Sequence, residues 1–301
     1  MAEDNIKTKS KKGKLIAVAI AAVVLGLGAF TGQQFVNDYA EGKLAAFTAT
    51  TGYDVTWSDV KVNIIKRTAE ITNVRVGTSD GIALAERIVL SDYKKGSPLP
   101  QNLVADVQGF SLPVTRPIFG RYYAPLWHVG YREIAGSVVL GLALSPEKQL
   151  DILVSNLTMD YVGVADARIS LANVDETSIA NIFRSIDRKT LSQGWLTFVD
   201  GGLTSRSVAA FAKDANIPID DAESRILNGL NRRMQTQYRT ESAERTALTQ
   251  LYRYFDNPSK LTITIKENQA RLLSEFTPPQ TEGWRRMAVW FISRPFDIVA
   301  N

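Results

Sequence analysis

Alternating apolar and polar residues dominate the first half of the chain and indicate β-strands. Val55 and Trp57 alternate with polar neighbours, and the same period of two continues through Val60–Ile64. Such runs, separated by turns rich in Asp, Gly and Lys, are typical of consecutive antiparallel strands with one face buried. We therefore predict one elongated antiparallel sheet across residues 52–203. Its further strands are expected at Ile71–Val76, Ile82–Leu90, Val104–Leu112, Ser137–Leu144, Leu150–Asn156, Leu157–Val162, Ala167–Val174 and Trp195–Val199.

Helical spacing replaces this alternation in the C-terminal third of the chain. Apolar residues recur every three to four positions within 204–258, which we expect to be a helical segment. Leu261–Lys266 then reads LTITIK and returns to strict alternation, so it is expected to rejoin the sheet. A short helix is predicted at Trp284–Ile292, which gives 259–301 a final strand and a C-terminal helix. The fold class expected from these patterns is α+β.

An uncharged stretch near the N-terminus predicts a transmembrane helix. Leu15 to Gly32 reads LIAVAIAAVVLGLGAFTG, and 18 helical residues extend about 27 Å, close to the roughly 30 Å hydrocarbon core. Five lysines precede it, against Glu3 and Asp4, so residues 1–14 carry five minus two, or +3. By the positive-inside rule, this basic tip is cytoplasmic and the bulk of the chain is periplasmic.

The same stretch also fits a cleaved signal peptide, because a basic region precedes an apolar one that contains small residues. The helical pattern, however, continues without proline through Phe35, Tyr39 and Phe47 toward Gly52. We therefore expect 15–51 to be a transmembrane helix with a juxtamembrane continuation. A buried core helix is a third interpretation, in which the lysine flank would be coincidental. The expected location is the bacterial inner membrane, crossed once.

Composition removes several classes of function. The chain has no cysteine, which excludes disulfides and thiolate chemistry, and one histidine, His128, which excludes a site with two histidines. The net charge is +4, and because the tip carries +3 the remainder carries only +1. A near-neutral body is not an electrostatic footprint for phosphates, so no nucleic-acid partner is expected. We predict neither a metal nor a cofactor.

The segment from Leu44 to Leu112 resembles the start of AsmA-like envelope proteins. In both, a helix runs into a junction, here Thr51-Gly52-Tyr53-Asp54-Val55, that leads to short strands. The strands that match are Trp57–Ile64, Ala69–Val76 and Leu84–Leu90. The resemblance implies a bent β-sheet, sometimes an open groove with an apolar lining, and a role in envelope homeostasis or phospholipid movement.

The densest aromatic and basic stretch runs from Phe119 to Arg132 and includes His128. A catalytic histidine needs a nucleophile and an orienting carboxylate, which this stretch does not supply. Trp, Tyr and Arg also favour a membrane interface or a partner surface. The plainer interpretation is a loop folded over one end of the sheet, with the polar tips of its rings satisfied locally. The candidate interface residues here are Tyr122, Tyr123, Trp127 and Tyr131.

Two further groups are candidates for binding. Trp284, Arg285 and Trp290 suit a membrane interface or a docking helix, and a segment this short favours docking. An apolar stripe on the concave face of the sheet is the candidate lipid groove, although the same residues could fill an ordinary core. Its expected members are Leu157, Met159, Tyr161, Ile169 and Leu171.

The sequence thus predicts a non-enzymatic, single-pass membrane protein whose periplasmic β domain binds or moves lipid. Its expected partners are the bilayer and phospholipid. The alternative is an accessory or scaffold subunit of a larger membrane complex, with other membrane-protein subunits as partners.

Overall fold

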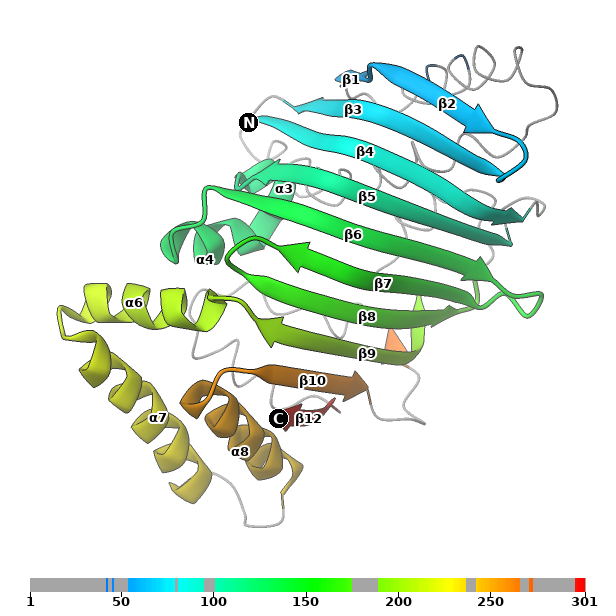
Figure 1. Cartoon of the computed structure of the whole chain (residues 1–301). Coiled ribbons are helices and arrows are strands. Elements are labelled where there is room, and N and C mark those ends of the chain that lie inside the picture. Colours follow the sequence, from blue (N-terminus) through cyan, green and yellow to red (C-terminus); the bar gives the residue numbers. More distant parts are fainter. Residues whose placement is uncertain are drawn as a thin grey trace, which may run out of the picture.

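One antiparallel sheet forms the body of the protein. The computed structural model describes residues 42, 45, 54–78, 81–94, 101–174, 189–236, 242–265, 271–272 and 296–300. The sheet has 12 strands in the order β1-β3-β4-β5-β6-β7-β8-β9-β10-β12, with β2 beside β3 and β11 beside β9 (Figure 1). The strands are β1 Asp54–Thr56, β2 Asp59–Asn63, β3 Thr68–Thr78, β4 Gly81–Lys94, β5 Asn102–Pro113, β6 Glu133–Leu144, β7 Leu150–Met159, β8 Gly163–Ala172, β9 Thr190–Asp200, β10 Lys260–Ile265, β11 Arg271–Leu272 and β12 Phe296–Ala300.

Helices leave the sheet at two places and gather at one end of it (Figure 1). The first group connects β5 to β6, and the second connects β9 to β10. The first group is α3 Arg116–Phe119, η2 Gly120–Tyr122 and α4 Tyr123–His128. The second is α6 Leu203–Ala215, α7 Ile219–Thr236 and α8 Ala243–Asp256.

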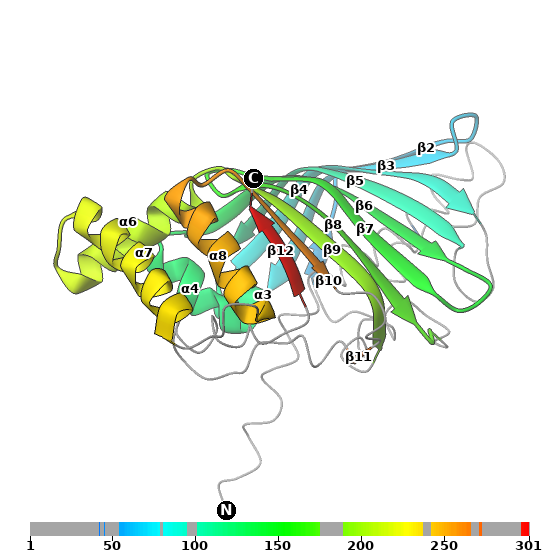
Figure 2. The ribbon, with the colours of Figure 1, turned by 90° about the horizontal axis from the view of Figure 1, so that it is seen from below.

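The sheet is bent, and the helices lie toward its inner side (Figure 2). Gly109 in β5 and Asn156 in β7 both have positive φ, and the pairing register shifts at each of them. Asn73 in β3 has positive φ near the same line across the strands. An extra residue in one strand bends it and strengthens the local twist. We attribute the bend to this line of irregular residues.

Each bulge also keeps the apolar side chains on one face. Val107 and Phe110 are both buried although they are three positions apart, because Gly109 between them resets the alternation. The core packed on the inner face includes Ile71 and Ile88, which are fully buried. Ile118 belongs to the same cluster, so α3 covers the inner face at its end of the sheet. The inner face is therefore the core-bearing face.

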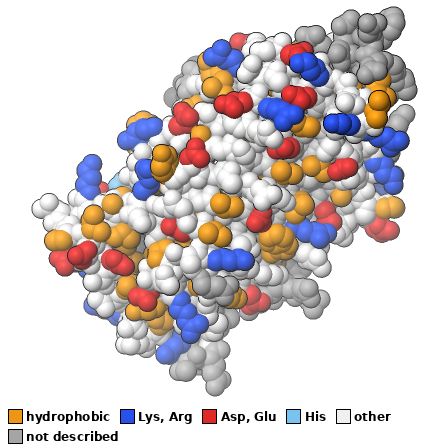
Figure 3. Space-filling view, viewed as in Figure 1, with side chains coloured by type: hydrophobic (Ala, Val, Ile, Leu, Met, Phe, Trp, Pro, Cys, Tyr) orange, Lys and Arg blue, Asp and Glu red, His pale blue; other side chains and the backbone are white. Residues whose placement is uncertain are grey.

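The outer face is mixed in character, with charged and apolar side chains interspersed (Figure 3). Arg87 pairs with Glu70 on the neighbouring strand at 2.8 Å, and Arg168 pairs with Asp151 at 2.6 Å. Exposed ion pairs of this kind contribute little to stability, about 0–1 kcal/mol each. Their consequence is a solvated outer surface.

The structure confirms a large antiparallel sheet with helices toward the C-terminus. Two local expectations were wrong. Leu150–Asn156 and Leu157–Val162 are not two strands, because β7 continues through the bulge at Asn156 and a turn follows Met159. The stretch 119–132 is not a loop, because most of it forms η2 and α4.

The predicted segments 1–14 and 15–51 lie outside the described residues, apart from Gly42 and Ala45, which are helical. The predicted helix Trp284–Ile292 also lies outside them. In the described part of the chain, no helix has both the length and the apolar composition needed to cross a membrane.

Candidate functional site: the inner face of the sheet

Apolar side chains continue across the inner face from β6 to β12. Cross-strand partners in an antiparallel sheet point to the same side. One row of successive cross-strand partners crosses six strands and is apolar throughout. The row next to it on the same face also has no polar side chain. The two rows are Leu140, Val154, Ala167, Leu196, Ile263 and Ile298, and Leu142, Ile152, Ile169, Gly194 and Ile265.

The burial of this face changes along the sheet. Ile71 and Ile88, on β3 and β4, are completely buried, whereas Leu196 on β9 is 37% exposed. Its row neighbours Leu140 and Val154 are half-buried. On β8 and β9 no charged side chain points inward until Asp200, where β9 ends. The central part of the inner face is therefore a partly exposed apolar surface, the kind of lining that sites for apolar ligands have.

Four of the five predicted groove residues lie on this inner face. Leu157 and Met159 belong to its larger cluster, Ile169 packs against a smaller one, and Leu171 is fully buried within that smaller cluster. Tyr161 is not on the face: it lies in the turn between β7 and β8 with a φ of 60° and is 73% exposed. The prediction that Tyr161 lies on this face was wrong, because it continued the alternation beyond Met159, where the strand ends.

The inner-face residues that sequence analysis missed are mainly Val154 and Leu196. Val154 belongs to the same face as Leu157, three positions later, which strict alternation forbids and the bulge at Asn156 permits. Leu196 sits beside Trp195, so the run Trp195–Val199 gave no sign of which apolar residues face inward. The asparagine within an apolar run was the available signal for the bulge.

Asp200 joins the sheet to the helices at the edge of the inner face. Its Oδ1 accepts hydrogen bonds from the amide and the hydroxyl of Thr204, each at 3.1 Å, and Oδ2 accepts one from the Gly202 amide. The Tyr254 hydroxyl, on α8, donates to Oδ1 at 3.4 Å. Burial, together with the nearby charge of Asp200, raises the pKa of Tyr254 to about 12. This cluster holds α6 and α8 against the end of β9.

The predicted aromatic interface is partly buried and partly exposed. Tyr131 is buried, and its hydroxyl donates to the carbonyl of Tyr161 at 2.7 Å. Arg132 lies over the ring of Trp127 at 3.7 Å from its centroid and donates to that residue's carbonyl at 2.9 Å. Tyr123 stacks at a tilt on Trp127, with centroids 5.5 Å apart. Packing thus explains much of this stretch.

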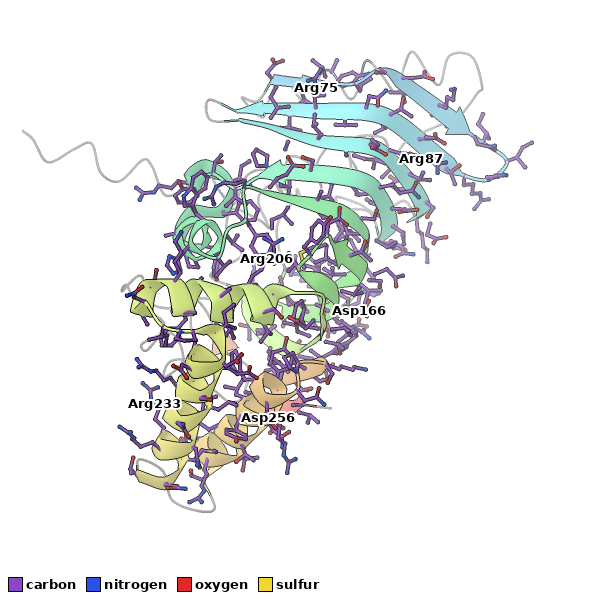
Figure 4. The ribbon with its side chains drawn as sticks, turned by 60° about the vertical axis from the view of Figure 1, so that its left-hand side comes forward. Arg75, Arg87, Asp166, Arg206, Arg233 and Asp256 are labelled. Atoms are coloured by element: carbon purple, nitrogen blue, oxygen red, sulfur yellow. The ribbon has the colours of Figure 1, made fainter. Side chains whose placement is uncertain are left out.

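Two of the predicted interface residues, Tyr122 and Trp127, are exposed. His128 also lies at the surface, where its Nε2 is 2.8 Å from Oδ2 of Asp214 on α6. Arg206, also on α6, is labelled in Figure 4. Its Cζ lies 4.9 Å from the ring centroid of Tyr131 and 5.6 Å from that of Tyr161. The contact between His128 and Asp214 couples α4 to α6, and Arg206 joins α6 to the segments that follow α4 and β7.

Comparison with known proteins gives one match. Residues 150–279, from the start of β7 past β11, match a protein family described only as an uncharacterized protein. This match does not overlap the segment 44–112. No curated protein and no solved structure matches the chain.

Candidate metal ligands do not cluster in the part of the chain that the structure describes: no three His, Cys, Asp or Glu side chains converge there. Trp284, Arg285 and Trp290 lie outside the described residues.

Proposed function

We propose that this chain is a non-enzymatic, single-pass protein of the bacterial inner membrane whose periplasmic β domain holds lipid acyl chains against its inner face. Envelope homeostasis or lipid transport is the role we assign to it. The observation that carries the proposal is the unbroken apolar row across β6–β12, half-exposed at its centre around Leu196. Burying such a surface against an acyl chain is favourable by about 25 cal/mol per Å² of apolar area.

The sequence supports the membrane part of this proposal. An uncharged stretch behind five lysines precedes the sheet, and its charge flank favours a cytoplasmic N-terminus. The resemblance of Leu44–Leu112 to AsmA-like proteins supports the same assignment independently of the inner face.

A matched pair of substitutions on β9 tests lipid binding. Leu196 faces inward and is 37% exposed, whereas Val199 faces outward and is 42% exposed. We expect phospholipid to co-purify with the full-length protein in mild detergent and to be detected by native mass spectrometry. Leu196→Asp should lose that lipid, and Val199→Asp should keep it.

The result is decisive in both directions. Absence of phospholipid from the unsubstituted protein, or equal loss in both variants, would refute the lipid proposal. Circular dichroism of both variants checks that the sheet has formed.

A second function is favoured by the exposure of Tyr122 and Trp127 on the coupled α4–α6 surface. Aromatic residues are enriched where proteins meet. In this alternative the chain is an accessory or scaffold subunit of a membrane complex. It predicts stoichiometric co-purification of another membrane protein that Trp127→Ala abolishes. A strictly monomeric particle after mild extraction would argue against it.

A further inference from the structure

The turn between β2 and β3 lies at the end of the sheet away from the helices (Figure 1). It presents apolar side chains to solvent. Ile65 is 91% exposed, and Ile64 beside it is also exposed. The turn has defined hydrogen bonds: the Lys66 amide donates to Asn63 Oδ1 at 2.9 Å, and the Arg67 amide donates to the Ile64 carbonyl at 3.3 Å. Two isoleucines are therefore displayed by a hydrogen-bonded turn, where water is the least favourable surrounding for them.

Cations surround these isoleucines. Lys66 and Arg67 are exposed, and neither takes part in an ion pair among the residues that the structure describes. Lys61 is paired with Asp59 at 2.8 Å. Lysine and arginine side chains are visible at this corner of the outer face (Figure 3). The described charged residues at and next to this turn carry a net charge of +2 from five cations and three anions: Asp59, Lys61, Lys66, Arg67, Glu70, Arg87, Asp92 and Lys94.

We infer that the β2–β3 turn rests on the surface of an anionic phospholipid bilayer, the same bilayer that holds the N-terminal apolar segment. Exposed apolar side chains flanked by Lys and Arg suit the headgroup region, where the apolar groups leave water and the cations meet anionic lipid. This inference rests on the membrane anchor of the proposed function and adds a second contact with the membrane. It does not depend on lipid binding at the inner face.

The geometry allows the contact with the anchoring bilayer. Residues 33–53 join the apolar run to β1, and the 19 residues of the helical continuation expected through residue 51 would extend about 28 Å. From Asp54 to Asn63, β1 and β2 cover about 33 Å along the sheet edge. The turn can therefore reach the membrane when this edge runs from β1 back toward it.

Tethering explains why the turn contacts the bilayer that anchors the chain. Two isoleucines and two unpaired cations bind too weakly to recruit a free protein to a membrane. A tethered site, however, meets its target at an effective concentration in the millimolar range. A weak contact is then sufficient to orient the domain.

The absence of native cysteine makes a direct test simple. Ile65→Cys in the full-length protein is labelled with an environment-sensitive fluorophore and reconstituted into vesicles of phosphatidylcholine with phosphatidylglycerol. Phospholipids that carry a spin-label quencher report contact with the bilayer. The matched control is Ile219→Cys, an isoleucine 56% exposed at the start of α7 and followed by Asp220 and Asp221.

We expect lipid quenching at position 65 and none at position 219. Adding Lys66→Gln and Arg67→Gln to the labelled protein should weaken the contact about fivefold for each cation removed, which is the factor for ~1 kcal/mol per basic residue at an anionic surface. Pure phosphatidylcholine vesicles should have a similar effect.

Several outcomes would overturn the inference. Equal quenching at both positions would refute the turn contact. So would the absence of quenching at position 65 in protein that floats with its vesicles, and that result would leave the membrane anchor supported. Protection of the position 65 probe from iodide in detergent as well as in vesicles would indicate a protein contact instead. Failure of the unsubstituted protein to float would remove the anchor and the turn contact together.

Discussion

The hydroxyl of Tyr254 on α8 lies 3.4 Å from the carboxylate of Asp200 at the end of β9, although 54 positions separate the two residues. Asp200 also binds the first turn of α6 through Thr204. One carboxylate therefore fixes where two helices leave and rejoin the sheet. The position of the helices relative to the inner face depends on this contact.

Replacing Asp200 by alanine should destabilise the protein. The substitution removes the acceptor of the Gly202 and Thr204 amides at the start of α6, and a buried donor left without its acceptor costs about 1–3 kcal/mol. Urea unfolding of the detergent-solubilised protein, followed by tryptophan fluorescence, measures the change. Asp160→Ala, at an exposed position in the β7–β8 turn, is the control. Equal destabilisation by both substitutions would show that the hydrogen bonds accepted by Asp200 do not stabilise the protein more than an exposed aspartate does.

Tyr254 should ionise later than an ordinary tyrosine. Burial is the main reason that its pKa rises from 10.0 to about 12. Because the folded-state pKa is the higher one, this tyrosine does not lower the free energy of unfolding below about pH 10. The free energy of unfolding falls as the pH rises from about 10 through about 12, where the buried hydroxyl must ionise. Ultraviolet difference spectra should show a late tyrosinate transition that Tyr254→Phe removes. A titration unchanged by that substitution would contradict the assignment.

Gly136 and Gly229 should respond to alanine in opposite ways. A Cβ at Gly136 in β6 would lie 1.8 Å from the Thr158 carbonyl oxygen on β7, so Gly136→Ala must force these strands apart. A Cβ at Gly229, within α7, would meet nothing within 4 Å. Gly229→Ala should stabilise the protein by about 0.5–1 kcal/mol because alanine favours the helix. Thermal unfolding of the two variants measures both effects, and a destabilising Gly229→Ala would refute the second.

Asp151 should make the protein sensitive to acid. Partial burial raises the pKa of its carboxyl, but hydrogen bonds from Ser170, Arg168 and Gln149 outweigh burial and leave the pKa lowered. A lowered folded-state pKa gives stabilisation that is present above about pH 3.9 and is lost as the pH falls through the folded value. Asp151→Asn should flatten the acid side of the stability profile measured by urea unfolding. Asp160→Asn should leave it unchanged, and the same flattening there would point to a general charge effect.

The sequence predicted the regular strands well because one face of the sheet is buried. β5 and β6 occupy Asn102–Pro113 and Glu133–Leu144, close to the expected runs Val104–Leu112 and Ser137–Leu144. Burial of one face produces the period of two that a sequence reveals. The helical segment and the strand at Leu261–Lys266 followed from the same reasoning.

The bulges were not predictable from alternation alone. Asn156 resembled a turn residue, so a continuous strand was divided in two. The aromatic stretch contains too few turns of helix to show a period, so its sequence pattern predicts a loop. Both errors arise because the sequence pattern at each place covers fewer residues than the strand or the group of helices to which it belongs.

The candidate site was predictable only in part. Leu157, Met159, Ile169 and Leu171 share the inner face because their strands keep their alternation, while Tyr161 lies beyond the end of its strand. The contacts between His128 and Asp214 and between Asp200 and Tyr254 join residues 86 and 54 positions apart. No local pattern encodes such contacts, since they depend on how the helices pack.

From β3 to β9 each strand pairs with the next one along the chain. Neighbours in sequence therefore become neighbours in space, and such local contacts favour rapid assembly. If the strands left a narrow passage in the order of the chain, each could join the growing edge of the sheet as it emerged. The strands β10, β11 and β12 would have to wait until the longer helical excursion after β9 had come through.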